Sequence, residues 1–184
     1  ILIIYGGFGL SDEAEVSKKS GLAVLAAAKE SDAIVSGFEL NNKNLELLKY
    51  QIMDFDLIFP VLHGKFGEDG QIQKIFEEAG IKYIGSDSFS SKLCFDKIAT
   101  KQILEQHNIL TPKWEKITTP QDLTQWQMPY VIKQSASGSS IGVWIVKSES
   151  DLDQINWGRE LLVEDFVCGQ EITVGILGNK ALPV

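Results

Sequence analysis

The stretch DLIFPVLHGKFGEDG, residues 56–70, contains an apolar run followed by a glycine-rich loop. The apolar run at 56–62 has the composition of a strand that is buried on both faces, and His63 and Gly64 close it. After the loop, apolar residues recur at the spacing of one face of an amphipathic helix, at Ile72, Ile75, Phe76 and Ala79. A buried strand, a glycine-rich loop and a helix in this order predict a parallel sheet.

The residues before and after this stretch repeat the alternation of strand and helix. Residues 1–5 form an apolar run that stops at Gly6-Gly7, which predicts another buried strand. The further expected elements are helices at 13–29 and 41–50 and strands at 33–40 and 81–84. This alternation predicts an α/β fold in which a parallel sheet carries helices on both faces.

The second half of the chain has a different pattern, in which one helix is followed mainly by strands. Apolar residues mark the helix, at Phe95, Ala99 and Ile103. The expected strands are 114–117, 130–133, 142–147, 161–167 and 171–177. The second and third of these flank a loop rich in glycine and serine, residues 135–142, which predicts a hairpin. Polar residues gather at 86–91, and we place a domain boundary there.

The chain of 184 residues has the composition of a globular protein, with 44% hydrophobic and 23% charged residues. These values exclude disorder and a collagen-like structure for the chain as a whole. Acidic residues outnumber Lys and Arg by 25 to 17, so the net charge is −8 and nucleic acid is not an expected partner. No run approaches the ~18 apolar residues of a membrane helix, so we expect no membrane partner either.

Two cysteines, Cys94 and Cys168, lie far apart and form no CxxC motif. A disulfide framework and a cysteine-rich zinc site are therefore excluded, and His63 and His107 share no metal-binding spacing. Reduced cysteines are typical of the cytoplasm, where we expect the protein to be. Because the chain begins at Ile1 and ends on an apolar segment, we expect it to be part of a longer protein.

The loop at 135–142 is a candidate phosphate-binding element. Its glycines let the backbone approach a ligand closely, and its free N–H groups suit phosphate oxygens. Lys133 stands just before the loop and can supply a positive charge. Because the lysine precedes the glycines, the spacing is not that of a Walker A motif. The alternative is a flexible surface hairpin.

Two further segments follow strands of the predicted parallel sheet, and ligands bind at the carboxyl ends of such strands. His63 can donate a hydrogen bond to a carboxylate, and the N-terminus of the helix that follows favours the same anion. After Gly6-Gly7, Glu13 offers a carboxylate to an ammonium group. Together these residues predict a site for an amino acid. The alternatives are that Asp69 only caps its helix and that Glu13 only complements a helix dipole.

Two other segments gain significance only in combination. Lys97 follows Asp96 near the start of a helix, a position where a lone lysine is usually solvated. Residues 162–171 combine a strand, a turn and a strand with acids at each end, and such a segment could hold a purine and a ribose. Taken alone, it is better explained as an amphipathic hairpin with exposed acids.

In combination, these segments resemble the D-alanine–D-alanine ligase family of the ATP-grasp superfamily, over essentially the whole chain. The matching motifs, in order, are Gly6-Gly7, residues 13–17, His63-Gly64 with residues 67–70, residues 83–86, Asp96-Lys97, Thr111-Pro112, residues 131–133, residues 138–142, Val163-Glu164 and residues 169–171. The resemblance implies three parts. An N-terminal parallel α/β (pre-ATP-grasp) domain would span 1–87, and an α+β ATP-grasp central subdomain would span 88–163. A hinge and the start of a truncated C-terminal lobe would span 164–184.

The resemblance also implies a reaction, the ATP-dependent joining of two D-alanines for peptidoglycan synthesis. ATP would phosphorylate the carboxylate of the first D-alanine, and the amine of the second would attack the acyl phosphate. Glu13 would hold the first ammonium group and form a catalytic network with Ser139, and His63 would lie beside the first carboxylate. ATP would contact Lys97, Lys133, Ser140, Gly142, Glu164, Asp165, Val167 and Glu171. We expect one common cavity among Glu13, His63, Lys97 and Lys133.

The chain departs from the family's usual residues at two positions, where Gln134 replaces a proline and Phe95 replaces a methionine. We expect the ligands of a magnesium or manganese ion, a catalytic arginine and a catalytic tyrosine beyond Val184. The 184 residues alone should therefore have no ligase activity. The alternatives are a D-alanine–D-lactate or D-alanine–D-serine ligase and a non-catalytic module that binds a nucleotide and an amino acid. The resemblance further suggests a homodimer through the first domain.

Overall fold

A three-stranded parallel sheet forms the centre of the N-terminal half in the computed structural model, which describes residues 1–8 and 11–184. The strands are β1 (Leu2–Gly6), β2 (Ser36–Leu40) and β3 (Ile58–Pro60), in the order β2-β1-β3. The helices are α1 (Ser11–Ala28), α2 (Leu45–Gln51) and α3 (Gln71–Glu78), and a 3₁₀ turn, η1 (Ile52–Asp54), follows α2. The predicted alternation of strand and helix is confirmed through α3.

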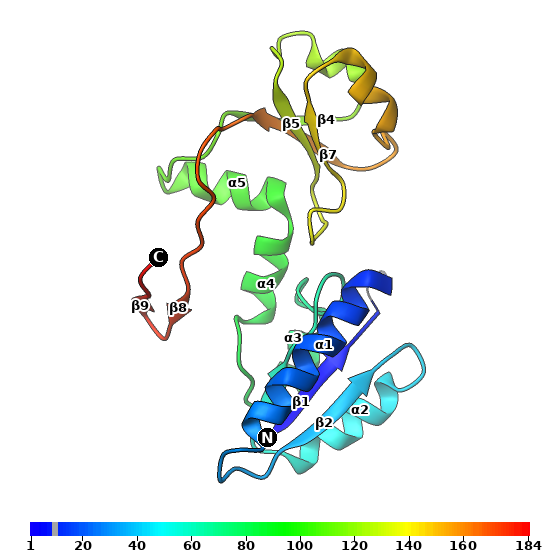
Figure 1. Ribbon diagram of the computed structural model, residues 1–184, viewed down its shortest axis with the longest axis vertical. Helices are drawn as coiled ribbons and strands as arrows, with labels where there is room; N and C mark the ends of the chain where they lie inside the picture. The colour runs from blue at the N-terminus through cyan, green and yellow to red at the C-terminus, as the bar shows by residue number, and fades with distance from the viewer. Residues whose placement is uncertain (9–10) are drawn as a thin grey trace.

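The side chains of β1 alternate between two apolar faces, which explains why helices cover both sides of the sheet. Leu2 and Ile4 share one buried cluster with Leu48 of α2 and Phe76 of α3. On the opposite face the ring of Tyr5 lies against α1 at Gly21, where an added Cβ would come within 2.2 Å of the Tyr5 Cβ. Figure 1 shows α1 in front of the sheet and α2 behind it.

The strand predicted at 81–84 is wrong. This segment contributes only one parallel bridge, in which Tyr83 pairs with Ile58. The backbone N–H of Ile58 donates to Lys82, and that of Ile84 donates to Ile58. Because β3 is only three residues long and ends at Pro60, which has no N–H, it offers too short an edge for a fourth strand.

Two helices, α4 (Ser88–Phe95) and α5 (Lys97–Gln106), connect the two halves of the molecule (Figure 1). Helix α4 was not predicted from the sequence, because its first turn lies in the polar cluster at 86–91. Asp87 caps this helix by accepting a hydrogen bond from the backbone N–H of Ser90. None of the described helices is long and apolar enough to cross a lipid bilayer.

A four-stranded antiparallel sheet forms the second half. Its strands are β4 (Trp114–Ile117), β5 (Tyr130–Gln134), β6 (Val143–Val146) and β7 (Leu161–Asp165), in the order β4-β7-β5-β6. Two 3₁₀ turns, η2 (Pro120–Leu123) and η3 (Glu149–Gln154), cover the sheet and add Leu123 and Leu152 to its core. The predicted hairpin is confirmed, because β5 pairs with β6 on either side of the loop at 135–142.

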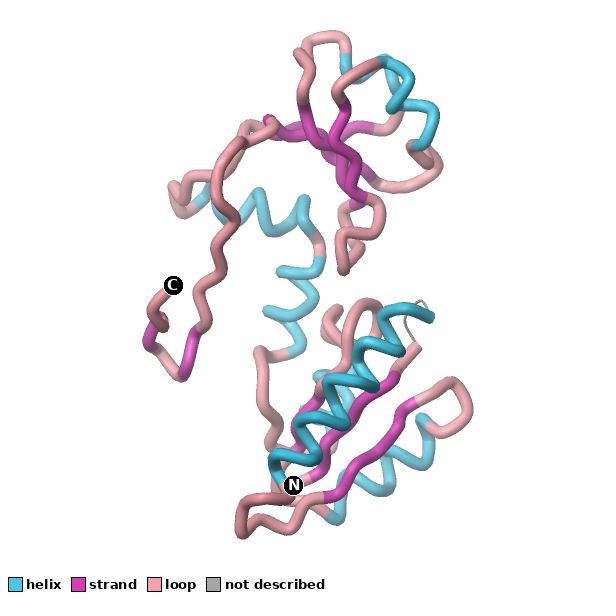
Figure 2. The backbone as a smooth tube through the Cα atoms, viewed as in Figure 1, coloured by secondary structure: helices cyan, strands magenta, loops and turns pink. Residues whose placement is uncertain are grey.

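The strand predicted at 171–177 is wrong. Only a two-residue hairpin forms there, between β8 (Ile176–Leu177) and β9 (Lys180–Ala181). Figure 2 shows the segment before it as a long irregular stretch that leaves the antiparallel sheet. The neighbouring strand β7 already has β4 on one edge and β5 on the other, so it leaves no edge for residues 171–175 to join.

Candidate active site

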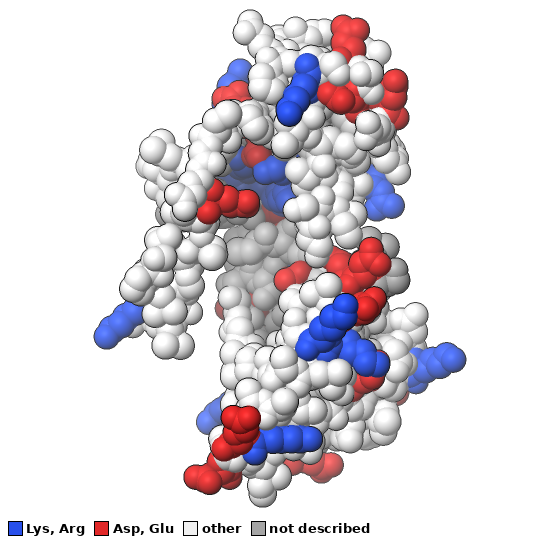
Figure 3. Space-filling view, viewed as in Figure 1, with Lys and Arg blue, Asp and Glu red and all other residues white. Residues whose placement is uncertain are grey.

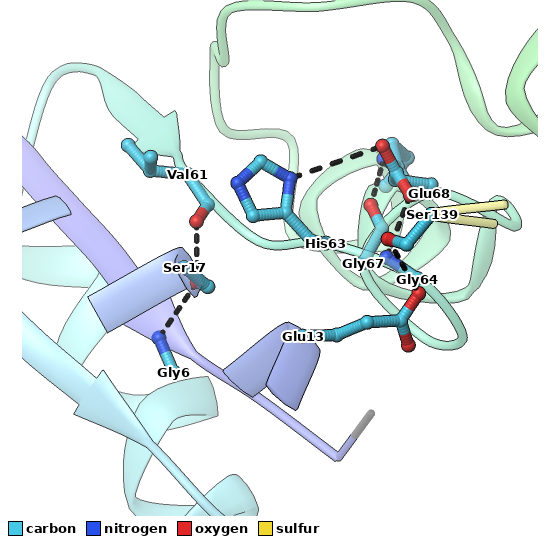
Figure 4. Close-up of polar contacts among 10 residues, drawn as sticks. Gly6, Glu13, Ser17, Val61, His63, Gly64, Gly67, Glu68 and Ser139 are labelled. Carbon is cyan, nitrogen blue, oxygen red and sulfur yellow. Dashed lines mark hydrogen bonds and ion pairs between the residues drawn. The ribbon is translucent and has the colours of Figure 1, made fainter. Parts of the chain in front are cut away.

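Glu13 and Ser139 meet between the two halves of the molecule, although 126 positions separate them in the sequence. The Ser139 hydroxyl donates a hydrogen bond to Oε1 of Glu13 across 3.0 Å. Glu13 lies in the first turn of α1 and is only 6% exposed. Figure 4 shows Ser139 reaching this carboxylate from the β5–β6 hairpin. The sequence analysis expected these two residues to belong to one network, and the structure brings them into contact.

Ser17, one turn after Glu13, fixes the start of α1 to the parallel sheet. Its buried hydroxyl accepts a hydrogen bond from the backbone N–H of Gly6 at 2.9 Å and donates one to the carbonyl of Val61 at 2.5 Å (Figure 4). Gly6 ends β1, and Val61 follows β3. These two bonds therefore place Glu13 at the carboxyl edge of the sheet, the edge where open α/β sheets bind ligands.

Two glycines make room for the Glu13 carboxylate. Gly64 has a φ of 68°, and an added Cβ would lie 2.1 Å from Oε2 of Glu13. At Gly138 an added Cβ would lie 3.3 Å from Oε1. One carboxylate is therefore enclosed by α1, by the loop after β3 and by the loop between β5 and β6.

His63 lies in the loop after β3 and faces a carboxylate of that loop. The distance between His63 Nδ1 and Oε1 of Glu68 is 4.0 Å, and Oε2 of Glu68 accepts a hydrogen bond from the backbone N–H of Gly64 at 2.6 Å (Figure 4). Glu68 was not among the predicted site residues. Its place four residues after Gly64 allows its carboxylate to reach back across the turn to the Gly64 N–H. The prediction that Asp69 caps α3 is wrong, because the N-cap is Gly70; Asp69 precedes the cap and accepts a hydrogen bond from the N–H of Gln71 at 3.2 Å.

Lys97 lies at the start of α5 and points toward the loop at 135–142. Its Nζ donates hydrogen bonds to the carbonyls of Ser137, at 2.6 Å, and Ser135, at 3.3 Å. Asp96 caps the same helix and accepts a hydrogen bond from the hydroxyl of Ser135. Lys97 is half-buried and bonded to the loop, so it is not the solvated surface residue that a lysine at this position usually is.

Glu164 of β7 is buried between two lysines from different elements. Nζ of Lys101, on α5, lies 2.7 Å from Oε2 of Glu164, and Nζ of Lys133, on β5, pairs with Oε1. The side chains of Glu164 and Lys101 are 8% and 10% exposed, and that of Lys133 is 28% exposed. Lys101 was not among the residues predicted for the site, although it pairs with Glu164. Its spacing of four from Lys97, which puts both on one face of a helix, was the available signal.

The local electrostatics favour an anionic ligand beside these lysines. Burial opposes the ionisation of Glu164, but the hydrogen bonds from Lys101 and Lys133 outweigh it and hold the pKa of the carboxyl below its usual value. For Lys97, burial disfavours the charged ammonium and so lowers the pKa, and the nearby charge of Lys133 lowers it further. Among the described residues, three lysines (Lys97, Lys101 and Lys133) thus outnumber the two carboxylates beside them, Glu164 and Asp96, which leaves positive charge that a phosphate group can neutralise.

A cavity of about 330 Å³ adjoins this cluster. Its lining comes from both halves of the molecule: Phe8, Glu13, Lys65, Phe95, Gln134, Ala136, Ser137, Gly138, Ile141 and Arg159. The expected common cavity is not found as stated, because His63, Lys97 and Lys133 are not among the lining residues. The backbone of the loop at 135–142 lies in between, since the Ser137 carbonyl holds Lys97 while Ser137 lines the cavity. Figure 3 shows the surface hollowed between the two halves, with charged side chains inside the hollow.

The remaining predicted residues lie at the edges of this region. Ser139 and Ser140 have left-handed backbones, with φ of 54° and 58°, and Gly142, with φ of 71°, packs against the side chain of Gln134. Three residues are exposed at the end of β7 and in the stretch after it: Asp165, Val167 and Glu171. Within residues 1–8 and 11–184, no group of three or more His, Cys, Asp or Glu side chains could hold a metal ion.

Protein-family models match most of the chain. Residues 36–86 match the model of the D-ala D-ala ligase N-terminus, and residues 100–184 match that of the D-ala D-ala ligase C-terminus. The chain is 38% identical to a D-alanine–D-alanine ligase of Aquifex aeolicus, over 100% of the chain and 65% of that protein. It is 35% identical to a D-alanine–D-alanine ligase A of Bacillus cereus, over 96% of the chain and 61% of that protein. The chain thus spans less than two thirds of these curated relatives.

Solved structures give the same result. A crystal structure of D-alanine–D-alanine ligase from Bacillus anthracis superposes with a TM-score of 0.86 at 34% identity, and the match covers 99% of this chain and 62% of that one. A structure of that enzyme complexed with ATP has a TM-score of 0.84 at 32% identity, covering 99% of this chain and 63% of that one. The VanG D-Ala:D-Ser ligase of Enterococcus faecalis is more distant, with a TM-score of 0.69 at 27% identity and coverage of 91% and 62%.

Proposed function

We propose that this chain, which belongs to the D-alanine–D-alanine ligase family, carries the first-substrate site and part of the nucleotide site of an enzyme that joins two D-alanines at the expense of ATP. The product, D-alanyl-D-alanine, would serve peptidoglycan synthesis, and ADP and phosphate would be released. The observation that carries the proposal is the contact of Glu13 with Ser139, formed between the two halves of the molecule by the loop whose Ser137 carbonyl binds Lys97.

The first D-alanine would bind at the carboxyl edge of the parallel sheet. Glu13 would hold its ammonium group, because this buried carboxylate has one protein donor, the Ser139 hydroxyl, among the hydrogen bonds of the described residues. His63 lies on the loop that also carries Gly64, beside the same carboxylate, and would face the carboxylate of the substrate. Ser139 would act in catalysis with Glu13 by keeping that carboxylate oriented.

The nucleotide would bind along the antiparallel sheet. Lys97 and Lys133 would hold the phosphates, and Ser140 and Gly142 would close over them with the loop at 135–142. We propose that Glu164, Asp165 and Val167 surround the adenine and that Glu171 binds the ribose. The exposure of the last three supports this part of the proposal, since they are free of the core.

The proposed chemistry is a phosphoryl transfer followed by an acyl transfer. A carboxylate oxygen of the first D-alanine forms a bond to the γ-phosphorus, and the bond from that phosphorus to ADP breaks. The amine of the second D-alanine then attacks the acyl carbon, and phosphate leaves as the amide forms. Positive charge from the lysines stabilises the transferring group. The loop at 135–142 excludes water, which would otherwise hydrolyse the acyl phosphate.

The described residues do not fit the magnesium or manganese ion that the resemblance implies, because they contain no suitable cluster of ligands. None of the steps proposed for these residues therefore involves a metal ion. We keep the divisions at 1–87, 88–163 and 164–184 as the proposed parts of the chain.

We also propose a cytoplasmic location and a homodimer through the first part. The two free cysteines, Cys94 and Cys168, suit a reducing compartment. Exposed apolar side chains at Leu47, Tyr50 and Met53 support a contact surface on and just after α2. Light scattering of the purified protein tests the dimer, and a monomer at micromolar concentration would argue against it.

The ligase activity is tested on the full-length gene product that contains this sequence. With ATP, magnesium and D-alanine, we expect equal amounts of ADP and D-alanyl-D-alanine, and D-serine and D-lactate are offered as competing second substrates. Glu13→Gln should lose most of the activity. Glu15→Gln is the matched control, because Glu15 lies on the same helix but is exposed and paired with Lys19. Nucleotide binding without dipeptide formation would favour the non-catalytic module instead.

A further inference from the structure

Glu164 has two lysine partners that differ in how firmly they are held. Lys101 also donates hydrogen bonds to the Thr111 hydroxyl, at 2.5 Å, and to the Pro112 carbonyl, at 3.4 Å. Lys133 has no such second anchor among the hydrogen bonds of the described residues, and its side chain is nearly three times as exposed as that of Lys101. Of the two lysines, Lys133 is therefore the one that is free to exchange partners.

We propose that Glu164 is the resident partner that Lys133 exchanges for the phosphates of a nucleotide, and that Lys101 is the positioning residue that keeps Glu164 ionised after the exchange. This inference rests on the proposed function, in which Lys133 holds phosphate. It assigns a role to Lys101, which no motif of the sequence analysis included. It adds a role for the Glu164 carboxylate to the adenine contact proposed above.

The position of Glu164 makes Lys101 necessary for such an exchange. The backbone of Glu164 lies inside the sheet, between Trp114 of β4 and Val131 of β5, and its side chain is only 8% exposed, so the carboxylate has little access to solvent when Lys133 leaves. A buried carboxylate without a partner takes up a proton instead of remaining charged. With Lys101 in place, 2.7 Å away, Glu164 retains an ion pair and a hydrogen bond throughout.

The charged groups that face Glu164 come from two elements. They are Lys97 and Lys101 of α5 and Lys133 of β5, as far as the described residues show. Lys97 cannot replace Lys101, because its Nζ is bonded to the carbonyls of Ser135 and Ser137 and is also assigned to phosphate. Among the described residues, Lys101 is thus the cation that remains with Glu164 when a nucleotide binds.

Calorimetry tests the exchange on the full-length protein, with a non-hydrolysable ATP analogue and magnesium as the ligand. Titrations in buffers of different ionisation enthalpy give the number of protons that the complex takes up. We expect wild type to take up close to none. Lys101→Gln should take up a fraction of a proton that increases as the pH is lowered through the neutral range, because Glu164 then loses its last charged partner. Lys101→Arg should restore wild-type behaviour.

Two further variants identify the group that takes up the proton. The double variant Lys101→Gln/Glu164→Gln should lose the additional uptake, because the titrating carboxyl is gone. Lys116→Gln is the matched control, since Lys116 also pairs with a glutamate, Glu160, but at a site that is about half exposed. It should behave as wild type does. Equal proton uptake by Lys101→Gln and wild type, with the analogue bound to both, would overturn the exchange and leave the proposed function intact.

A second measurement does not depend on the folding of the Lys101 variants. Glu164→Gln alone removes the partner that competes with phosphate for Lys133, so we expect it to bind the analogue about fivefold more tightly than wild type, as for the loss of one competing hydrogen bond. Weaker binding would mean that Glu164 does not compete with phosphate for Lys133 and serves only the proposed adenine contact, so it would contradict the exchange and leave the proposed function intact. If wild type binds no nucleotide at all, the proposed function is wrong and the exchange is wrong with it.

Discussion

The two charged clusters of this molecule are built in opposite ways. The Glu164 cluster lies at the antiparallel sheet, where the strands β7 and β5 and the helix α5 hold each group in place. The Glu13 cluster lies between the halves, where a helix end meets two loops and the Ser139 hydroxyl joins the hairpin to Glu13 of α1. The first cluster is therefore fixed by folding, whereas the second depends on how the loop at 135–142 is placed. In the proposed function, the fixed cluster would form the anion pocket before a ligand binds, and the loop would complete the amino-acid pocket.

The largest effect should follow from removing the centre of the fixed cluster. Glu164→Ala leaves Lys101 and Lys133 without their carboxylate, and breaking a buried ion pair in this way costs about 3–5 kcal/mol of unfolding free energy. Urea denaturation measures the loss. Glu160→Ala is the control, because the exposed pair of Glu160 with Lys116 should contribute only about 0–1 kcal/mol. Equal losses in the two variants would remove the distinction between a fixed cluster and an ordinary surface pair.

The second prediction disturbs the cluster between the halves by crowding it. Gly64→Ala places a Cβ 2.1 Å from Oε2 of Glu13, so the carboxylate must move. A displacement of that size should lower kcat/KM for dipeptide formation on the order of 100-fold. Gly80→Ala is the matched control, because Gly80 has nearly the same φ, 67°, but no atom within 4 Å of the added Cβ. If both variants lose activity equally, backbone strain and not the contact with Glu13 is the cause.

A third and smaller effect distinguishes two neighbouring residues of the loop at 135–142 by the substrate that each contacts in the proposed function. Ser139→Ala removes one hydrogen bond to Glu13. The loss should weaken substrate binding by about 1 kcal/mol, which corresponds to an about fivefold higher KM for D-alanine. Ser140→Ala changes the neighbouring residue, which is assigned to the nucleotide, and should alter the KM for ATP instead. Steady-state kinetics with each substrate varied in turn distinguishes the two. The same pattern in both variants would mean that the loop acts as one unit.

The smallest effect concerns pH and the charge of the fixed cluster. Because the folded-state pKa of Glu164 lies below its unfolded value, the stability that its ion pairs provide is fully present above the ordinary glutamate pKa. It is lost as the pH falls through the folded pKa. The difference in unfolding free energy between wild type and Glu164→Gln should therefore shrink in acid, as urea denaturation at several pH values would measure. A difference that stays constant with pH would assign the stability to packing.

Much of the fold was predictable because local patterns decide it. The apolar run of β1, the helical spacing of α3 and the hairpin around 135–142 are encoded by neighbouring residues. The wrong predictions fall on 81–84, which makes only one bridge to β3, and on 171–177, of which only the two residues of β8 form a strand. Pairing partners are tertiary, so sequence composition alone could not exclude these strands.

The sequence by itself determined the chemical inventory of this protein: a glycine-rich loop beside Lys133, an acid after Gly6-Gly7, and motifs in an order typical of one ligase family. Only the tertiary structure decided which groups touch. It brought Ser139 to Glu13 and placed Lys101 on Glu164, because contacts between residues far apart in the chain depend on how helices and strands pack. The same packing kept Lys97 and Lys133 off the cavity wall, with the Ser137 backbone between Lys97 and the cavity, an arrangement that no local pattern encodes.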